Sequence, residues 1–354
     1  MADKQKILIV GPRGIFGYEG GIEKFSDQFI YRAAHILEID VLTLHPFKGK
    51  RLKGLKTISV MPTHALKTDK LNYIISSIKQ HLKKKYDHIF ILGTNFSILI
   101  PFFKVIFWKK VKIHLRSGSV DHTLKKWPPA IRLAMQLTER FCNYADTVIS
   151  VSPSIQRHLA SIGVHSHLIR NGLDKSHKMP LATRKKCKVV CVGRITAQKN
   201  YSVLINAARL IDDTNIKIDI LGGADLSDEM HHLTQLMTSA IKPKIQFHGG
   251  VSRQMVYHHL STASLYINCS VHEGMSNAIL EAIQAGTPLL LSDIEANRDL
   301  QLPDFHYFDP HSPEDLILKI QDALSYMEKY IVPLDRFDDW DQTVDSIIHV
   351  TGMV

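Results

Sequence analysis

Short runs of β-branched and other apolar residues alternate with helical patterns along the chain, and this alternation restricts the possible folds more than any other feature. In the first half, strands are predicted at residues 6–10, 40–44, 57–61, 88–92, 112–115 and 147–151. A second series is predicted at 187–192, 217–221, 244–247, 265–269, 289–291 and 306–308. A repeated strand, helix, strand order produces parallel sheets with helices on both faces. The sequence therefore predicts an α/β protein with two doubly wound, Rossmann-like sheets.

The length of 354 residues exceeds what one core of ordinary size supports, which also favours two domains. The polar, basic stretch 174–188 is interpreted as the linker. We place the first domain at 1–173 and the second at 174–334, and expect a helix at about 335–354 to pack back on the first. Ligands of such sheets bind at the carboxyl ends of the strands, so we expect a cleft between two facing domains.

The first residues predict a strand and not a signal peptide. The longest apolar stretch, residues 96–108, contains Pro101 and Lys104 and is too short to span a bilayer. The four cysteines lack the spacing of a metal site and fit a reducing compartment; they are Cys142, Cys187, Cys191 and Cys269. We therefore expect a cytoplasmic protein.

The net charge of +10 is unevenly distributed. Residues 1–170 hold 27 Lys and Arg against 11 Asp and Glu, a balance of +16, and the remainder has a balance of −6. A charge of this size favours an anionic partner through long-range attraction, although single lysines are more often solvated surface residues. An anionic membrane is favoured because the apolar stretch 96–108 is followed by Lys109, Lys110 and Lys112. The alternative for that stretch is a buried helix of the first domain.

Three loops follow strand ends and contain residues suited to phosphate groups or to hydroxyls. GPRGIFGYEGG, at 11–21, opens a helix whose N-terminus favours an anion, although a plain turn explains it almost as well. GRITAQKN, at 193–200, places Arg194 and Lys199 where both can bind a diphosphate; the alternative is a solvated loop.

The third loop leads into the helix of HEGMSNAILEAIQAG, at 272–286. Backbone N–H groups of Gly274, Met275, Ser276 and Asn277 provide a second anion site. Glu273 lies beside it, on the loop, and suits sugar hydroxyls better than phosphate. Glu281 lies inside the helix, where it also suits hydroxyls, or belongs to a polar surface stripe with Asn277 and Gln284.

Taken together, the two glutamates spaced E-x7-E, VGRITAQKN, HLIRNGLD and the glycine-rich loop resemble family-4 retaining glycosyltransferases of the GT-B fold over nearly the whole chain. GPRGIFGYEGGIEKF and SVDHTLKKW further resemble a bacterial branch that makes surface polysaccharides. The resemblance implies that Glu273 contacts the donor sugar, Glu281 the ribose, and Arg194 with Lys199 the diphosphate. It also implies donor contacts from Gly20, Gly21 and Gly193 and from the helix start at 274–277.

The resemblance is weakest on the acceptor side. Many relatives carry a histidine or aspartate just after the strand that ends here in HLRSGSVDH, where the alignment places Gly118 or Ser119. Asp121 and His122 are the catalytic candidates. His114 is interpreted as a strand residue, and His122 is as well suited to packing as to catalysis.

The predicted activity is transfer of a hexose-like sugar, with retention, from a UDP, GDP or dTDP sugar to a saccharide or lipid-linked acceptor. No cofactor or obligatory metal is expected, because the only DxD-like pair, Asp339 with Asp341, lies where a final helix should pack. The alternatives are a nucleotide-sugar 2-epimerase of the same fold and a non-enzymatic nucleic-acid binder. The second is disfavoured because no RNA-binding motif or aromatic stacking platform is present.

Overall fold

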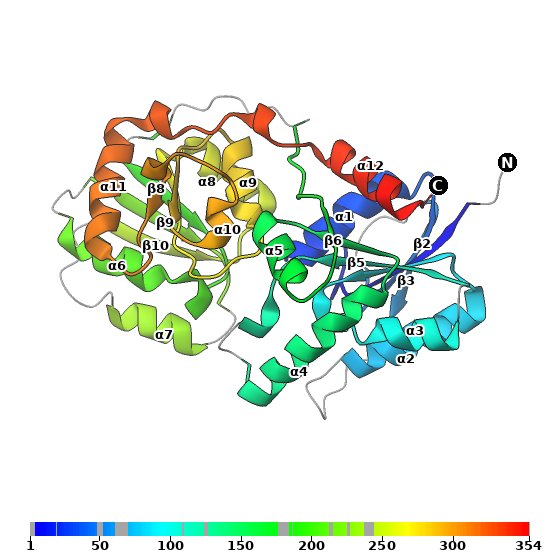
Figure 1. Ribbon diagram of the computed structural model, residues 1–354. Coiled ribbons are helices and arrows are strands. Elements are labelled where there is room, and N and C mark those ends of the chain that lie inside the picture. Colours follow the sequence, from blue (N-terminus) through cyan, green and yellow to red (C-terminus); the bar gives the residue numbers. More distant parts are fainter. Residues whose placement is uncertain are drawn as a thin grey trace. The chain divides into compact units, whose positions relative to one another are not determined.

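The computed structural model describes residues 4–18, 20–47, 52–60, 70–107, 110–123, 127–175, 184–185, 187–211, 215–224, 227–236 and 244–353, without the side chains of residues 70, 71, 121 and 227–229. The chain forms two compact units. Unit 1 comprises Met1–Gly172 and Asp338–Val354, and unit 2 comprises Leu173–Phe337. In Figure 1 unit 1 runs from blue to green and ends in the red helix α12.

Unit 1 is built on a seven-stranded parallel sheet in the order β3-β2-β1-β4-β5-β6-β7. The strands are β1 (Lys6–Val10), β2 (Glu38–Thr43), β3 (Leu55–Ser59), β4 (His88–Leu92), β5 (Lys112–Ser117), β6 (Thr147–Ser150) and β7 (His167–Leu168). The helices are α1 (Gly21–Ala33), α2 (Lys70–Lys84), α3 (Leu99–Ile106), α4 (Pro129–Glu139), α5 (Pro153–Ser161) and α12 (Trp340–Thr351). Short 3₁₀ segments lie at η1 (Thr94–Phe96), η2 (Asp121–Thr123) and η3 (Arg140–Tyr144).

The last helix of the chain, α12, packs on α1 (Figure 1). Asp339 caps α12 in a capping box with Gln342, and Trp340 is buried in the core beside Phe25. Asp341 forms an ion pair with Arg32, with 2.5 Å between Oδ1 and Nε. Both aspartates of the DxD-like sequence therefore serve the packing of this helix.

Unit 2 contains a six-stranded parallel sheet in the order β10-β9-β8-β11-β12-β13. The strands are β8 (Lys188–Val192), β9 (Lys217–Leu221), β10 (Lys244–Gly249), β11 (Leu265–Asn268), β12 (Leu289–Ser292) and β13 (Tyr307–Phe308). The helices are α6 (Tyr201–Leu210), α7 (Ser227–Leu236), α8 (Arg253–Thr262), α9 (Asn277–Gln284), α10 (Glu295–Arg298) and α11 (Pro313–Ser325), and 3₁₀ segments lie at η4 (Ala197–Lys199), η5 (Asp304–His306), η6 (Met327–Tyr330) and η7 (Leu334–Arg336).

Alternate residues of the central strands of unit 2 point to opposite faces of the sheet, and both faces are buried. Val189 and Cys191 of β8 belong to one apolar cluster, whereas Val190 between them belongs to another. This burial on two sides is what a doubly wound sheet requires, and it explains why its strands consist of continuous apolar runs. The predicted fold class is confirmed.

The described part of the apolar stretch 96–108 begins at the last residue of η1 and contains α3, and neither sequence-based interpretation describes it completely. Leu99, Ile100 and Phe103 are buried, as expected of a core helix. Phe102, Val105 and Ile106 are exposed, with 78% of Val105 accessible. The described helices include none with the length and hydropathy needed to cross a bilayer.

Candidate functional site

The first part of the site is the turn that leaves β8 in unit 2. Gly193 lies between the strand and η4, and its carbonyl oxygen accepts a hydrogen bond from the hydroxyl of Tyr201 at 2.9 Å. A Cβ at Gly193 would lie 3.0 Å from Cε of Lys199 and 3.1 Å from that hydroxyl. The turn is therefore compact because position 193 carries no side chain, and this brings Lys199 back over the end of the strand.

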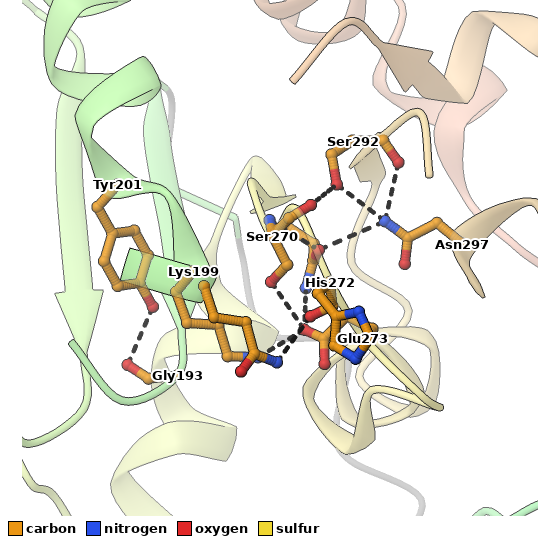
Figure 2. A network of polar contacts seen from close by, with 10 residues as sticks. Gly193, Lys199, Tyr201, Ser270, His272, Glu273, Ser292 and Asn297 are labelled. Atoms are coloured by element: carbon orange, nitrogen blue, oxygen red, sulfur yellow. Dashed lines mark hydrogen bonds and ion pairs between the residues drawn. The ribbon is translucent and has the colours of Figure 1, made fainter. Parts of the chain in front are cut away.

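The centre of the site is an ion pair between Lys199 and Glu273, with 2.5 Å between Nζ and Oε1 (Figure 2). The same carboxylate oxygen accepts hydrogen bonds from the hydroxyl of Ser270 at 2.7 Å and from the amide of Asn268 at 3.4 Å. Burial alone would raise the pKa of Glu273, but the Lys199 ammonium and these hydrogen bonds outweigh burial and lower it. Glu273 is therefore an ionised carboxylate held at the carboxyl edge of the sheet.

A layer of amides and hydroxyls supports this pair from behind. Asn297 donates to the carbonyl oxygen of Ser292 at 2.8 Å and to its hydroxyl at 3.0 Å, and Ser292 donates to the carbonyl oxygen of Ser270 at 2.5 Å (Figure 2). Asn297 also reaches Oδ1 of Asn268 at 3.4 Å. Asn268, Ser270 and Ser292 were not predicted, because their only signal was a small polar residue at or just after the end of an apolar strand, and Asn297, which lies in the short helix α10, carried no signal.

The loop that carries Glu273 is also fixed to η4. The side-chain amide of Gln198 donates to the backbone carbonyl oxygen of His272 at 2.7 Å. The backbone carbonyl oxygen of Gln198 accepts from the backbone N–H of Val271 at 3.0 Å. These two bonds join the loop after β8 to the loop after β11. The spacing of Lys199 and Glu273 is therefore set by backbone contacts as well as by their own charges.

The helix start beyond Glu273 is where the sequence placed it. Ser276 is the N-cap residue of α9 by backbone geometry, although within the described residues 244–353 its side chain makes no capping hydrogen bond. Gly274 and Ser276 are buried, and Met275 and Asn277 are half-buried. Glu281, in the second turn of α9, is only 9% exposed. The interpretation of Glu281 as part of a solvated stripe therefore fails. Arg194 lies on the same edge of the sheet and is exposed.

In unit 1 the glycine-rich loop is held by two acids of α1. Arg13 donates from its backbone N–H and from Nε to Oε1 of Glu23, at 3.2 and 3.1 Å, and Phe16 donates from its N–H to Asp27 at 2.7 Å. Gly20 is the N-cap of α1, and a Cβ there would collide with the Glu23 carboxylate. Gly21 is the first residue of the helix. The sequence analysis assigned no role to Glu23 or Asp27.

The acceptor-side candidates lie in η2. His122 is 13% exposed at its side chain, and its Nδ1 lies 3.0 Å from Oε1 of the buried Glu139, whose Oε2 lies 2.9 Å from Nε2 of His158. These three residues place a carboxylate and two imidazoles within 4.8 Å of one another, which is one arrangement that could hold a divalent ion. The backbone of Asp121 is part of η2, but its side chain lies outside the described residues.

His114 is a core residue, as the sequence indicated. Its Nε2 lies 2.9 Å from Nδ1 of the buried His88, and burial lowers the pKa of His114 to about 3. Its neighbour Arg116 was missed. The Arg116 guanidinium stacks over the ring of Phe25 at 3.9 Å and donates to Asn171 at 2.7 Å, and in the described part of the chain its Nε has no hydrogen-bond partner. The available signal was an arginine next to the apolar residue Leu115, at the end of a predicted strand.

Residues 174–330 match the family model described as glycosyl transferases group 1. This family model covers most of unit 2. A curated relative, an uncharacterized glycosyltransferase of Methanocaldococcus jannaschii, is 25% identical over 172 residues, which are 46% of this chain and 44% of that protein. The chain thus matches less than half of that relative's length. The match to this family model agrees with the glycosyltransferase prediction made from the E-x7-E region and the loop after β8.

Solved structures resemble the whole chain. Sucrose-phosphate synthase from Thermosynechococcus elongatus has a TM-score of 0.75 at 17% identity, over 98% of this chain and 96% of that one. HepE from Anabaena, in complex with UDP and glucose, has a TM-score of 0.76 at 16% identity, over 99% of this chain and 100% of that one. The chain therefore has the GT-B fold.

Proposed function

We propose that the protein is a retaining glycosyltransferase that moves a hexose-like sugar from a nucleoside-diphosphate sugar to a saccharide or lipid-linked acceptor. The observation that carries this proposal is the Lys199–Glu273 pair, held at 2.5 Å at the carboxyl edge of the sheet of unit 2, most of which matches the group 1 glycosyl transferase model. It joins a cation suited to phosphate with an ionised carboxylate suited to sugar hydroxyls. Unit 2 is accordingly the donor-binding unit and unit 1 the acceptor-binding unit.

In this proposal each donor group has its own partner. The diphosphate binds Arg194, Lys199 and the backbone N–H groups at the start of α9, with Gly193, Gly20 and Gly21 allowing close approach. Glu273 accepts hydrogen bonds from the transferred sugar, and Glu281 accepts them from the ribose. Because Glu273 has a lowered pKa, it remains an acceptor throughout the neutral range.

The reaction follows from stabilising the leaving group. The bond between the anomeric carbon and the diphosphate oxygen breaks while an acceptor oxygen bonds to that carbon from the same face. The acceptor proton passes to the departing diphosphate, and Arg194 and Lys199 neutralise the charge that develops there. His122, held by Glu139, and Asp121 are the proposed acceptor-side groups. The charges needed come from side chains and helix N-termini, so no obligatory metal is proposed.

The pathway and location are part of the same proposal. The resemblance of residues 11–25 and 119–127 to enzymes of bacterial surface polysaccharides favours capsule, O-antigen or a related polymer. Val105 and Ile106 are exposed on α3, and Lys79 and Lys83 are exposed on α2, so both helices offer side chains suited to anionic headgroups. The proposed location is the cytoplasm, at the inner face of the cell membrane.

A panel of UDP, GDP and dTDP sugars, screened by thermal shift, tests the proposal, because a bound ligand raises stability in proportion to RT ln(1+[L]/Kd). We expect one nucleotide class to raise the midpoint clearly above the others. The stabilising donor is then incubated with and without acceptor sugars, and the anomeric configuration of the product is read by NMR. An epimerised nucleotide sugar formed from donor alone would favour the 2-epimerase. No response to any nucleotide would refute a donor site.

A further inference from the structure

A polar cavity lies in unit 2, at the edge of the sheet opposite the Lys199–Glu273 pair. Lys188, Lys217 and Lys244 are the first residues of β8, β9 and β10, so they stand at the amino ends of three neighbouring parallel strands. The pairing register sets Lys217 directly opposite both other lysines. All three line one cavity of about 740 Å³, together with Lys185.

This row of lysines is electrostatically unfavourable in the unliganded protein. Neighbouring strands are only about 4.8 Å apart, and like charges directly opposite one another destabilise a sheet. Lys188 is nearly buried, with its Nζ 3.0 Å from Oγ1 of Thr262 and 3.6 Å from Oδ2 of Asp219. Among the described residues, Lys185, Lys217 and Lys244 form no ion pair. Among the described residues that line the cavity, the four lysines are therefore opposed by one carboxylate, that of Asp219, and a surplus of positive charge remains.

Asp219 is the single carboxylate among the described residues that line the cavity, and its oxygens are already used. Oδ1 accepts from Nε2 of His248 at 2.9 Å, and Oδ2 accepts from Nδ1 of His259 at 3.1 Å. One carboxylate thus orients two imidazoles and compensates part of the Lys188 charge. When each neutral ring directs its N–H at Asp219, its second ring nitrogen is a hydrogen-bond acceptor, so the lysines supply the donors for an anion.

A divalent cation is the obvious alternative, because Asp219, His248 and His259 bring their ligand atoms within 4.8 Å of one another. The surroundings argue against it. The Lys188 ammonium lies 3.6 Å from the same carboxylate, and three further lysines line the cavity, so a cation would be repelled at close range. The same charges attract an anion.

We propose that this cavity is a binding site for a small polyphosphate anion, separate from the donor site at the opposite edge of the sheet. Lysine ammonium groups are donors that phosphoryl oxygens accept from, and four lysines line the cavity. Apart from histidine, the described lining contains no aromatic side chain on which a nucleobase could stack. The site therefore recognises the phosphate chain and not a nucleoside.

The test is calorimetric titration of the intact chain with inorganic triphosphate. The measurements are made in an Arg194→Ala/Lys199→Ala background, so that binding at the proposed donor site does not contribute. We expect one triphosphate per chain, and at least a tenfold loss of affinity in Lys217→Gln/Lys244→Gln. Lys319→Gln/Lys329→Gln, with the same change of charge on and just beyond α11, is the matched control and should bind as the background protein does.

A second measurement needs no ligand. If the lysine row is repulsive, Lys217→Gln/Lys244→Gln should raise the thermal midpoint of the unliganded protein, whereas the control pair should not. Equal triphosphate affinity in the two double variants would overturn the proposal. A second outcome would also overturn it: tight binding of Zn²⁺ that is lost in His259→Gln, together with no binding of triphosphate. The cavity would then be a metal site. Both results are independent of whether the enzyme transfers sugars.

Discussion

Nζ of Lys199 lies 2.5 Å from Oε1 of Glu273, although 74 residues separate them in the sequence. Lys199 follows β8 and Glu273 follows β11, and these two strands are neighbours in the sheet of unit 2. Neighbouring parallel strands end at the same edge, so the loops after them meet. The pair needs no group from outside the chain. We therefore expect Lys199 to keep its contact with Glu273 when a donor binds. Its ammonium group would then interact with the carboxylate and with the diphosphate together.

Replacing Lys199 with methionine should reduce turnover by roughly 10²-fold or more, because its charge matters most as the diphosphate leaves. Arg194→Ala should act in the same direction. The affinity for the nucleoside without phosphates should change much less. An unchanged nucleoside affinity would show that the binding site is intact and that only the positive charge has been lost. The measurements are kcat and the nucleoside Kd, with Lys319→Gln as the control. Unchanged turnover in both variants would remove these residues from the mechanism.

Glu281→Ala should weaken nucleotide binding by roughly 1.5–3 kcal/mol, the usual range for hydrogen bonds to a charged group. The prediction rests on the proposed ribose contact and is measured by calorimetry with the nucleoside diphosphate. Gln284→Ala, in the last turn of the same helix, is the control. Because Glu281 is buried, the thermal midpoints of both variants must be compared first. Equal affinities in the two variants would assign Glu281 a packing role.

The sequence predicted the strands well because buried parallel strands are continuous apolar runs. β7 was not predicted, since His167 and Leu168 are exposed and two residues carry no periodic signal. The segment 96–108 was ambiguous for a physical reason: α3 buries Leu99 and Phe103 and exposes Val105, so its composition fits both a core helix and a surface stripe.

The site was predictable only in part. Lys199 and Glu273 each follow a strand, and their motifs gave their chemistry. Their contact depends on which strands are neighbours in the sheet, and so do the supporting hydrogen bonds of Ser292 and Asn297. The strand order is set by packing over the whole sheet. The same holds for His122, whose partners Glu139 and His158 come from two different helices.

The buried His88–His114 pair predicts that unit 1 loses stability in mild acid. Burial lowers the pKa of His88 to about 4 and that of His114 to about 3. Both rings stay neutral in the folded chain, whereas in the unfolded chain they take up protons below about pH 6.5. The stabilising contribution is therefore complete above pH 6.5 and is lost as the pH falls, by on the order of 3 kcal/mol for His88 at pH 4.

His114→Gln should flatten this dependence, because glutamine does not titrate and its amide can still donate to His88. All three tryptophans lie in unit 1, so the free energy of unfolding of this unit can be followed by tryptophan fluorescence in urea between pH 4.5 and 7.5. His165→Gln, at an exposed position, is the control. Parallel pH curves for the parent and His114→Gln would contradict the assignment.

The last prediction concerns the proposed membrane surface, where the structure changes the choice of variants. Of the three consecutive lysines at 83–85, Lys84 is not available to lipid, because its Nζ lies 2.6 Å from Oδ1 of Asp40 and 3.0 Å from Glu38. Lys79 and Lys83 are exposed and line an apolar hollow of about 570 Å³ with Ile75, Ile78 and Leu82 of α2. α3 lies beside α2, since Phe103 packs against His81 (Figure 1).

Liposome sedimentation should therefore show binding to anionic but not to neutral vesicles, with loss at high salt, because the attraction is screened over about 8 Å at physiological ionic strength. Lys79→Gln/Lys83→Gln should weaken binding by on the order of 1 kcal/mol per lysine, and Val105→Ser/Ile106→Ser should weaken it by removing apolar contact. Lys53→Gln/Lys56→Gln, exposed lysines in and just before β3, makes the same change of charge away from α2 and should have little effect. Equal recovery with neutral and anionic vesicles, or none with either, would leave the basic half of the chain without a membrane role.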